Sequence, residues 1–557
     1  MHNSFVSSLW KSLVVSSLGV VAAWPATAAD IRVGGTRLHG GVPAANARTG
    51  HPEDLLPDGF FLNLVAQGLD ALENPSGIIT RFGYVNDGAT QVFEPSKTEP
   101  DQNTYLVLDH NPGGPEAGYD YGRHFLFQGH EVFSGDLAYI TRINLDVANP
   151  DHHITLLTPV GDDGKTHFTS IDGTAWDPFT HTLLFTEEAG ANGGVVELSP
   201  EYATAIPRTL FGILGQAGYE GIRVDDRGSI YLVEDSGGTS VNVNPADPTS
   251  PKSAKVPNSY IYRFVPNNRS DLAQGGVLQA LQVSIYGAAL QYVPVDAAHP
   301  TGDAFSNAQL QLHTPGTSWP ATWVTVHDTA ATGFAPFNAN LLARGAGATP
   351  FKRPENGIFQ PGADFRTFFF TVTGDTDVRS GNVPDLAARG AWGSVFRLDL
   401  NHNRDRGQVA IVVLGDAVHA GFDNIGFDGS HVLLVGEDRG DTLHTQLNRL
   451  DSAWAFDVQQ PSLGLQRFVA LGRDKGAEFD AGLLGTAGFQ NEGDNEVTGL
   501  SDSDGDASVR GLLGSHSGGD DNLIFFTQQH GENNVYMVIP DSRGDDDDDH
   551  GAHHDHD

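Results

Sequence analysis

The stretch that most constrains the fold covers residues 219–237, which have the pattern of a β-hairpin with acidic residues at both ends. Its first strand alternates apolar and polar residues, as a strand with one buried face does. Asp-Asp-Arg-Gly then supplies turn residues, and Ile-Tyr-Leu-Val forms a second, β-branched and aromatic strand. Glu220 precedes the first strand, and Glu234 and Asp235 follow the second. Because both ends of a hairpin lie on one side, we expect these acids to lie close together.

The same pattern returns four more times, with an apolar residue four positions after each acid. These copies begin at Asp172, Glu355, Asp423 and Glu496. A further strand follows each hairpin, and residues 103–145 form a weaker unit at the front. Degenerate repeats of short strands are typical of radial β architectures. We therefore predict an all-β fold, a β-propeller of about six blades with long loop inserts.

The two ends of the chain differ from this repeat. Lys11 precedes an apolar run and a set of small residues, as in a signal peptide covering residues 1–29. The leader has no Arg-Arg pair, so we expect a Sec-type signal and export to the periplasm or outside the cell. An uncleaved N-terminal anchor is the alternative. At the other end, residues 541–557 are rich in Asp and His and should be disordered.

Between these ends we expect one propeller domain over residues 30–540. A long insert at about 266–350 contains two Trp and two Tyr residues, and we expect it to pack as a cap. Inserts of this kind usually crowd one face of a scaffold and carry function. After leader cleavage no stretch is long enough to span a membrane, and we expect a monomer.

Charge and cysteine content exclude several classes of function. The formal net charge is -38, from 32 basic and 70 acidic residues. Such a surface repels nucleic acid, because phosphate binding needs Lys and Arg. It suits hard cations, which prefer oxygen ligands. The chain contains no Cys, so it has no thiolate ligand, Cys nucleophile or iron–sulfur site.

The acids that begin the hairpins are the candidate metal ligands. Equivalent positions of propeller blades face the central channel, where several unpaired carboxylates would repel one another. Bound Ca²⁺ would relieve this repulsion. The alternative is that these acids are simply solvated, because Asp and Glu are common beside turns. The predicted metal ligands are Asp172, Glu187, Glu188, Glu220, Glu234, Glu355, Asp423, Glu437 and Glu496.

Two further blade-end acids, Asp235 and Asp438, could complete the metal shells. His530 follows a predicted strand at a channel-facing end and could be a ligand or a base. A structural histidine with satisfied hydrogen bonds is the alternative for His530.

Seven short motifs occur in order over residues 165–540. They are Thr186-Glu187-Glu188, Tyr219-Glu220-Gly221, Tyr231-Leu232-Val233-Glu234-Asp235, Arg353-Pro354-Glu355, Asp423-Asn424-Ile425-Gly426-Phe427-Asp428, Asn495-Glu496-Val497-Thr498-Gly499 and Gln529-His530-Gly531. Together they resemble the PhoX-type alkaline phosphatase family. The resemblance implies an exported six-bladed propeller that hydrolyses phosphate esters with iron and calcium at the channel mouth.

The resemblance also implies roles for individual residues. Glu187, Glu220, Glu355 and Glu496 match the family's metal-ligand motifs. An Arg fork suits phosphate oxygens, so Arg353, Arg379 or Arg439 would hold the substrate. The residues expected to act in catalysis are Glu220, Arg353, Arg439 and His530.

This chain departs from the family pattern in two respects. The family uses a Cys as an iron ligand just before the segment that matches residues 176–188, and this chain has none. The twin-arginine leader usual in the family is also missing. The lost Cys argues against Fe³⁺, and we expect Ca²⁺ as the cofactor.

These observations predict a secreted metal-dependent hydrolase that acts on a small-molecule phosphate ester through a metal-activated water. A second interpretation is a Ca²⁺-dependent lactonase or esterase on the same kind of propeller. A third is a non-catalytic binding propeller with structural calcium.

Overall fold

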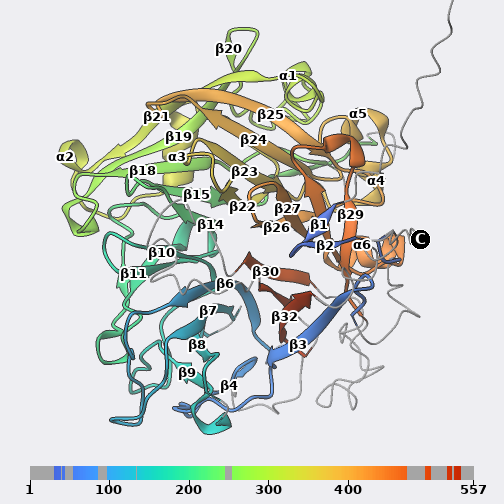
Figure 1. Cartoon of the computed structure of the whole chain (residues 1–557). Coiled ribbons are helices and arrows are strands. Elements are labelled where there is room, and N and C mark those ends of the chain that lie inside the picture. Colours follow the sequence, from blue (N-terminus) through green and yellow to red (C-terminus); the bar gives the residue numbers. More distant parts are fainter. Residues whose placement is uncertain are drawn as a thin grey trace, which may run out of the picture.

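The computed structural model describes residues 31–38, 41–43, 54–85, 97–132, 135–147, 149–244, 254–472, 496–502, 523–529 and 532–540. These residues form a ring of β-sheets with few and short helices (Figure 1). The ring confirms the predicted β-propeller. The leader, the Asp/His-rich tail and His530 lie outside the described residues.

Six four-stranded units, which we call blades 1 to 6, surround the centre. Blade 1 is β6 (Glu99–Val107), β7 (His124–Glu131), β8 (Tyr139–Asn144) and β9 (Ile154–Leu156); blade 2 is β10 (Ile171–Asp177), β11 (Thr182–Glu187), β12 (Gly194–Leu198) and β13 (Arg208–Thr209); blade 3 is β14 (Tyr219–Val224), β15 (Ile230–Glu234), β18 (Ile261–Pro266) and β19 (Gly276–Ile285). Blade 4 is β22 (Pro354–Phe359), β23 (Thr367–Val372), β24 (Ser394–Leu400) and β25 (Arg406–Leu414); blade 5 is β26 (Phe422–Asp428), β27 (Val432–Glu437), β28 (Ser452–Asp457) and β29 (Gln466–Ala470); blade 6 is β30 (Glu496–Asp502), β31 (Ile524–Gln529), β32 (Asn534–Pro540) and β3 (Phe60–Ala66).

The first strand of each blade lies innermost, and these six strands contact one another in a closed circle in the order β6, β10, β14, β22, β26, β30 and back to β6 (Figure 1). Blade 6 closes the ring, because its outermost strand β3 comes from the N-terminal part of the chain and pairs with β32 near the C-terminal end. Closure removes the exposed sheet edge that an open array of blades would leave.

Blades 3 and 4 are not separate sheets. The strand β21 (Trp319–Asp328) pairs with β19 on one side and with β25 on the other, so both blades belong to one ten-stranded sheet that also includes β20 (Ala288–Ala289). The large sheets of the ring therefore number five, although its four-stranded units number six. The predicted insert thus supplies outer strands of the ring as well as loops, because β19 and β21 both lie within it.

Shorter elements complete the described chain. Two-stranded sheets are formed by β1 (Arg32–Val33) with β2 (Thr36–Arg37), β4 (Ile79–Arg81) with β5 (Tyr84–Val85), and β16 (Ser240–Val241) with β17 (Ala254–Lys255). The α-helices are α1 (Asn307–Leu312), α2 (Thr329–Thr332), α3 (Ala339–Gly345), α4 (Val378–Gly381), α5 (Pro384–Ala387) and α6 (Gly440–Leu447). None of the helices in the described ranges has the length and apolar content that a membrane span requires.

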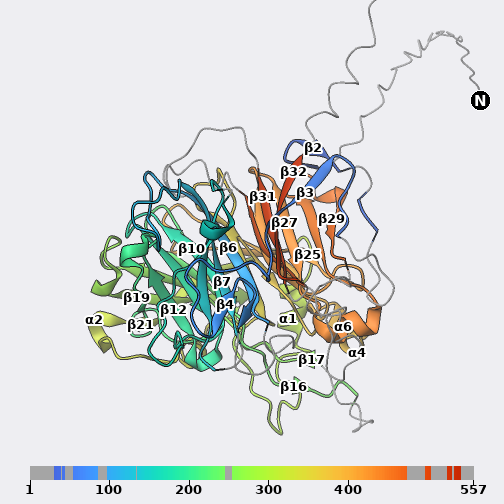
Figure 2. The same cartoon turned by 90° about the horizontal axis from the view of Figure 1, so that it is seen from below.

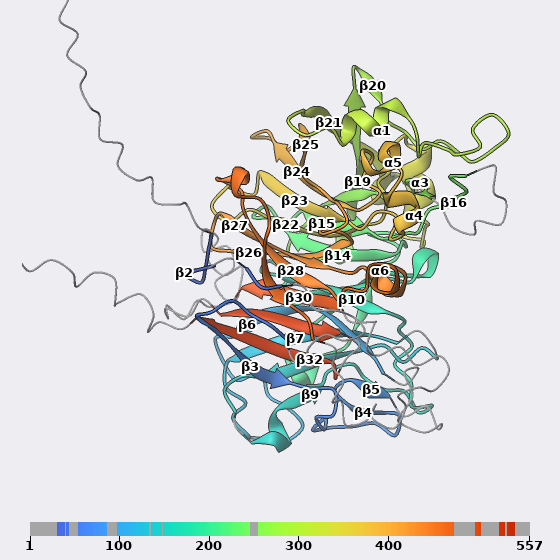
Figure 3. The ribbon, with the colours of Figure 1, turned by 90° about the vertical axis from the view of Figure 1, so that its right-hand side faces the viewer.

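The loops that join the second and third strands of blades 3, 4 and 5 leave one side of the ring. They carry β16 and β17, the helices α4 and α5, and the helix α6, which lie on the same side in Figures 2 and 3. The first strand of each blade begins on this side, since a hairpin returns the chain to the end where it started. The acids that begin the predicted hairpins therefore lie under these loops.

The core consists of packed layers between successive blades. Phe368 and Phe370 of β23 pack toward blade 3, whereas Phe369 between them packs toward blade 5. Both faces of the middle strands are buried, which explains their continuous apolar sequences. Apolar burial contributes about 25 cal/mol per Å², so these layers hold the ring together independently of the residues at its ends.

Candidate metal and phosphate site

Five of the six innermost strands contain a carboxylate at one structural position. In each of these strands the pairing register with the second strand shifts by one residue, and the acid is the first residue of the shifted segment. Such β-bulges re-aim side chains and are common beside active sites. The five acids are Asp101, Asp172, Glu220, Glu355 and Asp423.

The bulges also bring neighbouring blades very close together. A Cβ atom on Gly173 would lie 1.8 Å from the carbonyl oxygen of Glu220, so only glycine fits there. The hydroxyl of Thr186 donates a hydrogen bond of 2.8 Å to this same carbonyl oxygen. The backbone that carries Glu220 is thus held by the neighbouring blade 2.

A second set of acids comes from the ends of the second strands. In blade 1 the last residue of the second strand is acidic. In blades 2, 3 and 5 the residue that directly follows the second strand is acidic. These residues are Glu131, Glu188, Asp235 and Asp438. They lie at the same end of the ring as the first set.

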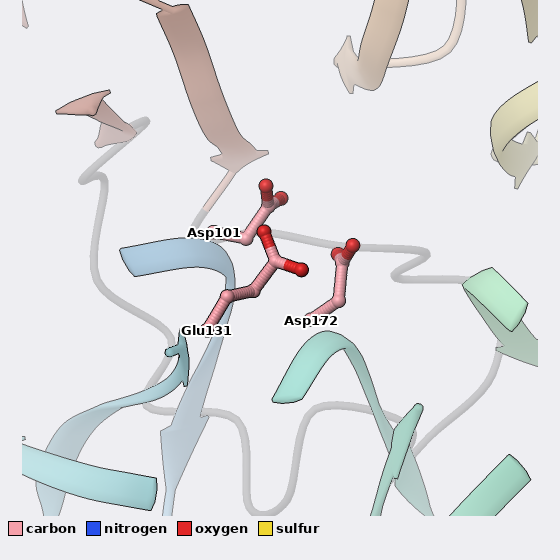
Figure 4. Close-up of side chains that lie close together, drawn as sticks. All are labelled: Asp101, Glu131 and Asp172. Carbon is pink, nitrogen blue, oxygen red and sulfur yellow. The ribbon is translucent and has the colours of Figure 1, made fainter. Parts of the chain in front are cut away.

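The two sets form four groups of three carboxylates whose oxygens lie within 4.8 Å of one another. The groups are Asp101–Glu131–Asp172, Glu188–Glu220–Asp235, Glu220–Glu355–Asp423 and Asp423–Asp438–Glu496. The side chains of the first group point toward one another (Figure 4). Glu220 and Asp423 each belong to two groups, so the groups contain ten carboxylates, which we call the carboxylate ring.

Burial and mutual repulsion disfavour the ionised form of these acids. Burial raises the pKa of Asp101 to about 8, and the charge of Asp423 adds to the increase. Burial also raises the pKa of Glu355 to about 8, although Arg353 partly offsets the increase. For Asp172, Glu188, Glu220 and Glu496, burial followed by nearby carboxylates raises the pKa well above its usual range.

Carboxylates of the ring lie in close pairs, among them Asp101 with Asp172, Glu220 with Glu355, and Asp423 with Glu496, whose oxygens lie within 4.8 Å of one another. Two carboxylates at this distance need either a shared proton or a cation between them. The ring can therefore hold either protonated, neutral acids or ionised acids with bound cations.

Neutral side chains that donate hydrogen bonds to this ring include Asn356, Asn424, Gln529 and Thr373. Asn356 donates its amide to Glu220, at 2.8 Å, and to Asp423, at 3.2 Å. Gln529 donates to Asp101 at 3.1 Å. By contrast, Oδ1 of Asp172 and Oδ1 of Asp235 are buried and have no hydrogen-bond partner among the residues that the structure describes. Buried polar atoms are rarely left in this way, and an oxygen ligand to a cation would account for both.

Arg353 is the cation that contacts the ring. Its Nε lies 2.9 Å from Asp235, and Nη2 lies 3.3 Å from Glu355. Its backbone φ of +53° lies in the left-handed region, which costs energy for a residue other than glycine. Its side chain is 19% exposed, so the guanidinium can still meet a ligand that enters from solvent.

The structure separates the predicted ligands into two sets. Asp172, Glu188, Glu220, Glu355, Asp423 and Glu496 belong to the ring. Glu187, Glu234 and Glu437 lie outside these groups. Glu187 accepts a hydrogen bond from the amide of Thr169, and burial raises its pKa to about 7.

The remaining predicted site residues have other partners. Glu234 accepts from Tyr262, from the amide of Tyr260 and from Asn340. Arg439 is 1% exposed and pairs with Glu437 at 2.7 Å, so it does not face the ring. Arg379 pairs with Asp377 on α4.

The predicted common register of Glu220, Glu355 and Glu496 holds for the first two only. In β30 the register shift lies between Thr498 and Ser501, so Glu496 precedes it. Glu496 nevertheless joins the ring through Asp423. Blade 6 thus contributes its acid to the ring from a different backbone position than the other blades do.

Sequence reasoning missed Asp101 and Glu131. A signal for Asp101 is present, because Tyr105 follows it by four residues, the same spacing as in the other copies. The weaker unit that the sequence predicts at the front starts at Asn103, two residues after Asp101. Glu131 carries no such mark, since it is recognisable only once its place after β7 is compared with that of Glu188.

The donor set fits hard divalent cations. All ten ring members offer carboxylate oxygens, and the chain has no thiolate to add. Ca²⁺ accepts six to eight oxygen ligands in flexible geometry. The clustering of four groups around shared members would suit several cations more than a single one.

Comparisons with known proteins bear on the family and the fold of this chain. A family model described as alkaline phosphatase PhoX matches residues 157–453, more than half of the chain. No curated protein matches the chain. The structure of Pseudomonas fluorescens PhoX in complex with vanadate, a transition state analogue, covers 91% of this chain and 98% of its own, with a TM-score of 0.54 and 13% identity. This similarity shows the same fold.

A gluconolactonase from Xanthomonas campestris covers 90% of this chain and 99% of its own. Its TM-score is 0.36 and its identity 10%. These values are too low to bear on the fold or on the function.

Proposed function

Because the chain belongs to the PhoX alkaline phosphatase family, we propose that the carboxylate ring is the active site of a phosphoric monoester hydrolase that acts on a small phosphate ester. The observation that carries this proposal is the ring itself: ten carboxylates from all six blades, two of them with unpartnered buried oxygens, beside one accessible Arg. A purely structural cluster would be expected to pair its acids with bases or amides.

Calcium is the cation that we propose for this ring. Asp172, Glu220, Glu355 and Asp423 would hold it together with acids of the second set, because these residues supply hard oxygen donors at close range. Bound divalent cations supply positive charge to the phosphoryl oxygens and make water a better nucleophile. The family's iron centre, which the resemblance ties to a thiolate, finds no Cys in this chain.

Arg353 would orient the phosphate. Asp235 and Glu355 hold its guanidinium from two directions and fix it at the ring. A fixed fork of N–H donors matches phosphate oxygens better than a flexible ammonium does. Substrate would therefore dock with its phosphate between Arg353 and the ring, and its remaining part toward the loops on this side.

We also propose that the protein is exported and acts as a monomer. Residues 1–29 have the composition of a signal peptide. N-terminal sequencing of protein recovered outside the cytoplasm should begin at Ala29 or Asp30. A sequence that begins at Met1 would contradict cleavage.

The activity is tested with p-nitrophenyl phosphate and a lactone in parallel, on protein with measured metal content. We expect hydrolysis of the phosphate ester only. In Arg353→Gln, kcat/KM should fall at least about tenfold, since a charge-assisted hydrogen bond to phosphate is lost. Arg379→Gln, which removes a half-exposed Arg on α4, is the matched control and should keep its activity. Equal activity in both variants would contradict the role of Arg353, and lactone hydrolysis alone would contradict the phosphatase.

A further inference from the structure

A cavity lies on the ring axis, at the opposite ends of the innermost strands from the carboxylates. It has a volume of about 150 Å³. Residues of β6, β10, β14, β22, β26 and β30 all line it, together with the turn between β22 and β23. We call it the axial cavity. It shares no lining residue with the carboxylate ring.

The walls of the axial cavity are mostly apolar and aromatic. They include Tyr105, Trp176, Phe359, Phe365 and Phe427, all of which are buried. An apolar protein cavity of about 150 Å³ is large enough to bind benzene. A single flat ring would therefore fit among these side chains.

One basic residue, Arg223 of β14, lines this apolar space. Its Nη1 donates to the carbonyl oxygens of Ile222 and Thr174, at 2.7 and 3.2 Å, and to Gln102 at 3.3 Å. In the described part of the chain, these are its only hydrogen bonds, and no carboxylate pairs with it. Burial lowers the pKa of Arg223 to about 10, so the group stays charged at neutral pH.

Of the other polar residues that line the cavity, Asn103 and Asp502 bear on which ligand it prefers. Nδ2 of Asn103, a residue that is 7% exposed, is buried and has no hydrogen-bond acceptor within the described ranges of the chain. Asp502 is the one acid in the lining and lies half-buried at the end of β30. A ligand with acceptor atoms would satisfy both Arg223 and the amide of Asn103, whereas a cationic ligand would satisfy neither.

We propose that the axial cavity binds a small organic monoanion with a flat apolar body, whose charged group contacts Arg223. Arg223 is half-buried, and a cation in such a place without a counter-charge is costly. An anion from solvent supplies that charge. The aromatic walls then exclude water from the rest of the ligand. This binding is independent of the phosphatase function, because it needs neither the carboxylate ring nor its cations.

Benzoate is a suitable probe, and benzamide is its uncharged analogue of nearly equal shape. Titration calorimetry should detect benzoate binding that is at least about tenfold tighter than benzamide binding, because a charge-assisted hydrogen bond is lost in the amide. The affinity should be the same with Ca²⁺ and with a chelator. Benzoate binding that disappears with the chelator would overturn the proposal, since it would place the probe at the carboxylate ring.

Variants locate the site. Arg223→Gln should weaken benzoate binding at least about tenfold and leave benzamide binding unchanged. Arg227→Gln is the matched control, because Arg227 lies on the same hairpin but is exposed and contacts backbone oxygens of residues 402 and 403. Equal benzoate affinity in Arg223→Gln and Arg227→Gln would overturn the proposal.

A filling variant covers the case in which Arg223→Gln folds poorly. Ile358 is a half-buried lining residue of β22, and Ile358→Trp places an indole in the space of the ligand while Arg223 remains. It should abolish binding of both probes, with melting temperatures recorded for each variant. Unchanged benzoate affinity in this variant would also overturn the proposal.

Discussion

Two consecutive acids at the end of β27 have opposite surroundings. Glu437 is fully buried and pairs with Arg439, which also approaches Asp451; His444 of α6 completes this cluster by contacting Asp451 at 2.8 Å. Asp438, the next residue, points into the carboxylate ring beside Asp423 and Glu496. Successive residues of a strand point to opposite sides. Glu437 therefore faces a basic partner, whereas Asp438 faces other carboxylates.

This difference teaches that burial of an acid does not by itself identify a site. Burial raises the pKa of Glu234 to about 8, the same value as for Glu355. Glu234, however, accepts hydrogen bonds from three donors. What distinguishes the ring is that its members lie in groups of three carboxylates. Arg353, which pairs with Asp235 and Glu355, offsets only a small part of their charge.

Removal of divalent cations is the strongest test of this contrast. We expect a chelator to reduce p-nitrophenyl phosphate hydrolysis at least about 100-fold, because the ring then supplies no positive charge to the phosphoryl group. The melting temperature should also fall, since a cation at a hundredfold excess over its Kd stabilises the native state by about 2.7 kcal/mol. Added Ca²⁺ should restore both. Unchanged activity and melting temperature in the chelator would contradict a cation site.

Two substitutions, one in the carboxylate ring and one beside Arg439, test this contrast. Glu220→Gln should lose bound metal and at least about tenfold of the activity, because a neutral amide is a poorer ligand for a hard cation. Glu437→Gln should keep its metal content but lose about 3–5 kcal/mol of stability, since it leaves a buried Arg439 without its closest acidic partner. Metal analysis and thermal unfolding of both variants distinguish these outcomes. Metal loss in Glu437→Gln alone would reverse the assignment.

Much of the fold was predictable from sequence because each blade repeats one local pattern. Alternating strands, turn residues and the acid at a fixed distance from an apolar residue indicate a hairpin, and repetition indicates a ring. The bridge made by β21 was not predictable, since pairing at the outer edge depends on where two blades meet in space. The sequence also could not show that Asp438, and not Glu437, belongs to the carboxylate ring. Sequence spacing does not indicate which side of a strand end faces the axis.

The pH dependence of stability should separate the cation-free and the cation-bound protein. The folded pKa values of Asp101 and Glu355, about 8, lie above the value of about 4 for an unfolded acid. The folded protein without cations therefore holds protons that the unfolded chain releases, and its stability should fall as the pH rises from about 4 to about 8. With saturating Ca²⁺ the acids are already ionised, so this fall should be absent. Melting temperatures at pH 5 and pH 8 in both conditions provide the check, and parallel curves would contradict the explanation.

Glu496→Gln should have the smallest effect, because blade 6 supplies its acid from outside the common register. Glu496 is half-buried and belongs to one group of three, whereas Glu220 belongs to two. Its loss leaves Asp423 and Asp438 in place beside the remaining groups. We expect the Kd for Ca²⁺ at one site to rise by less than about tenfold, which corresponds to less than about 1.4 kcal/mol, with little change in melting temperature at saturating Ca²⁺. Calcium titration beside Glu220→Gln is the measurement. An equal or larger loss in Glu496→Gln would mean that the register shift of β30 serves to place this acid at the centre of the metal site.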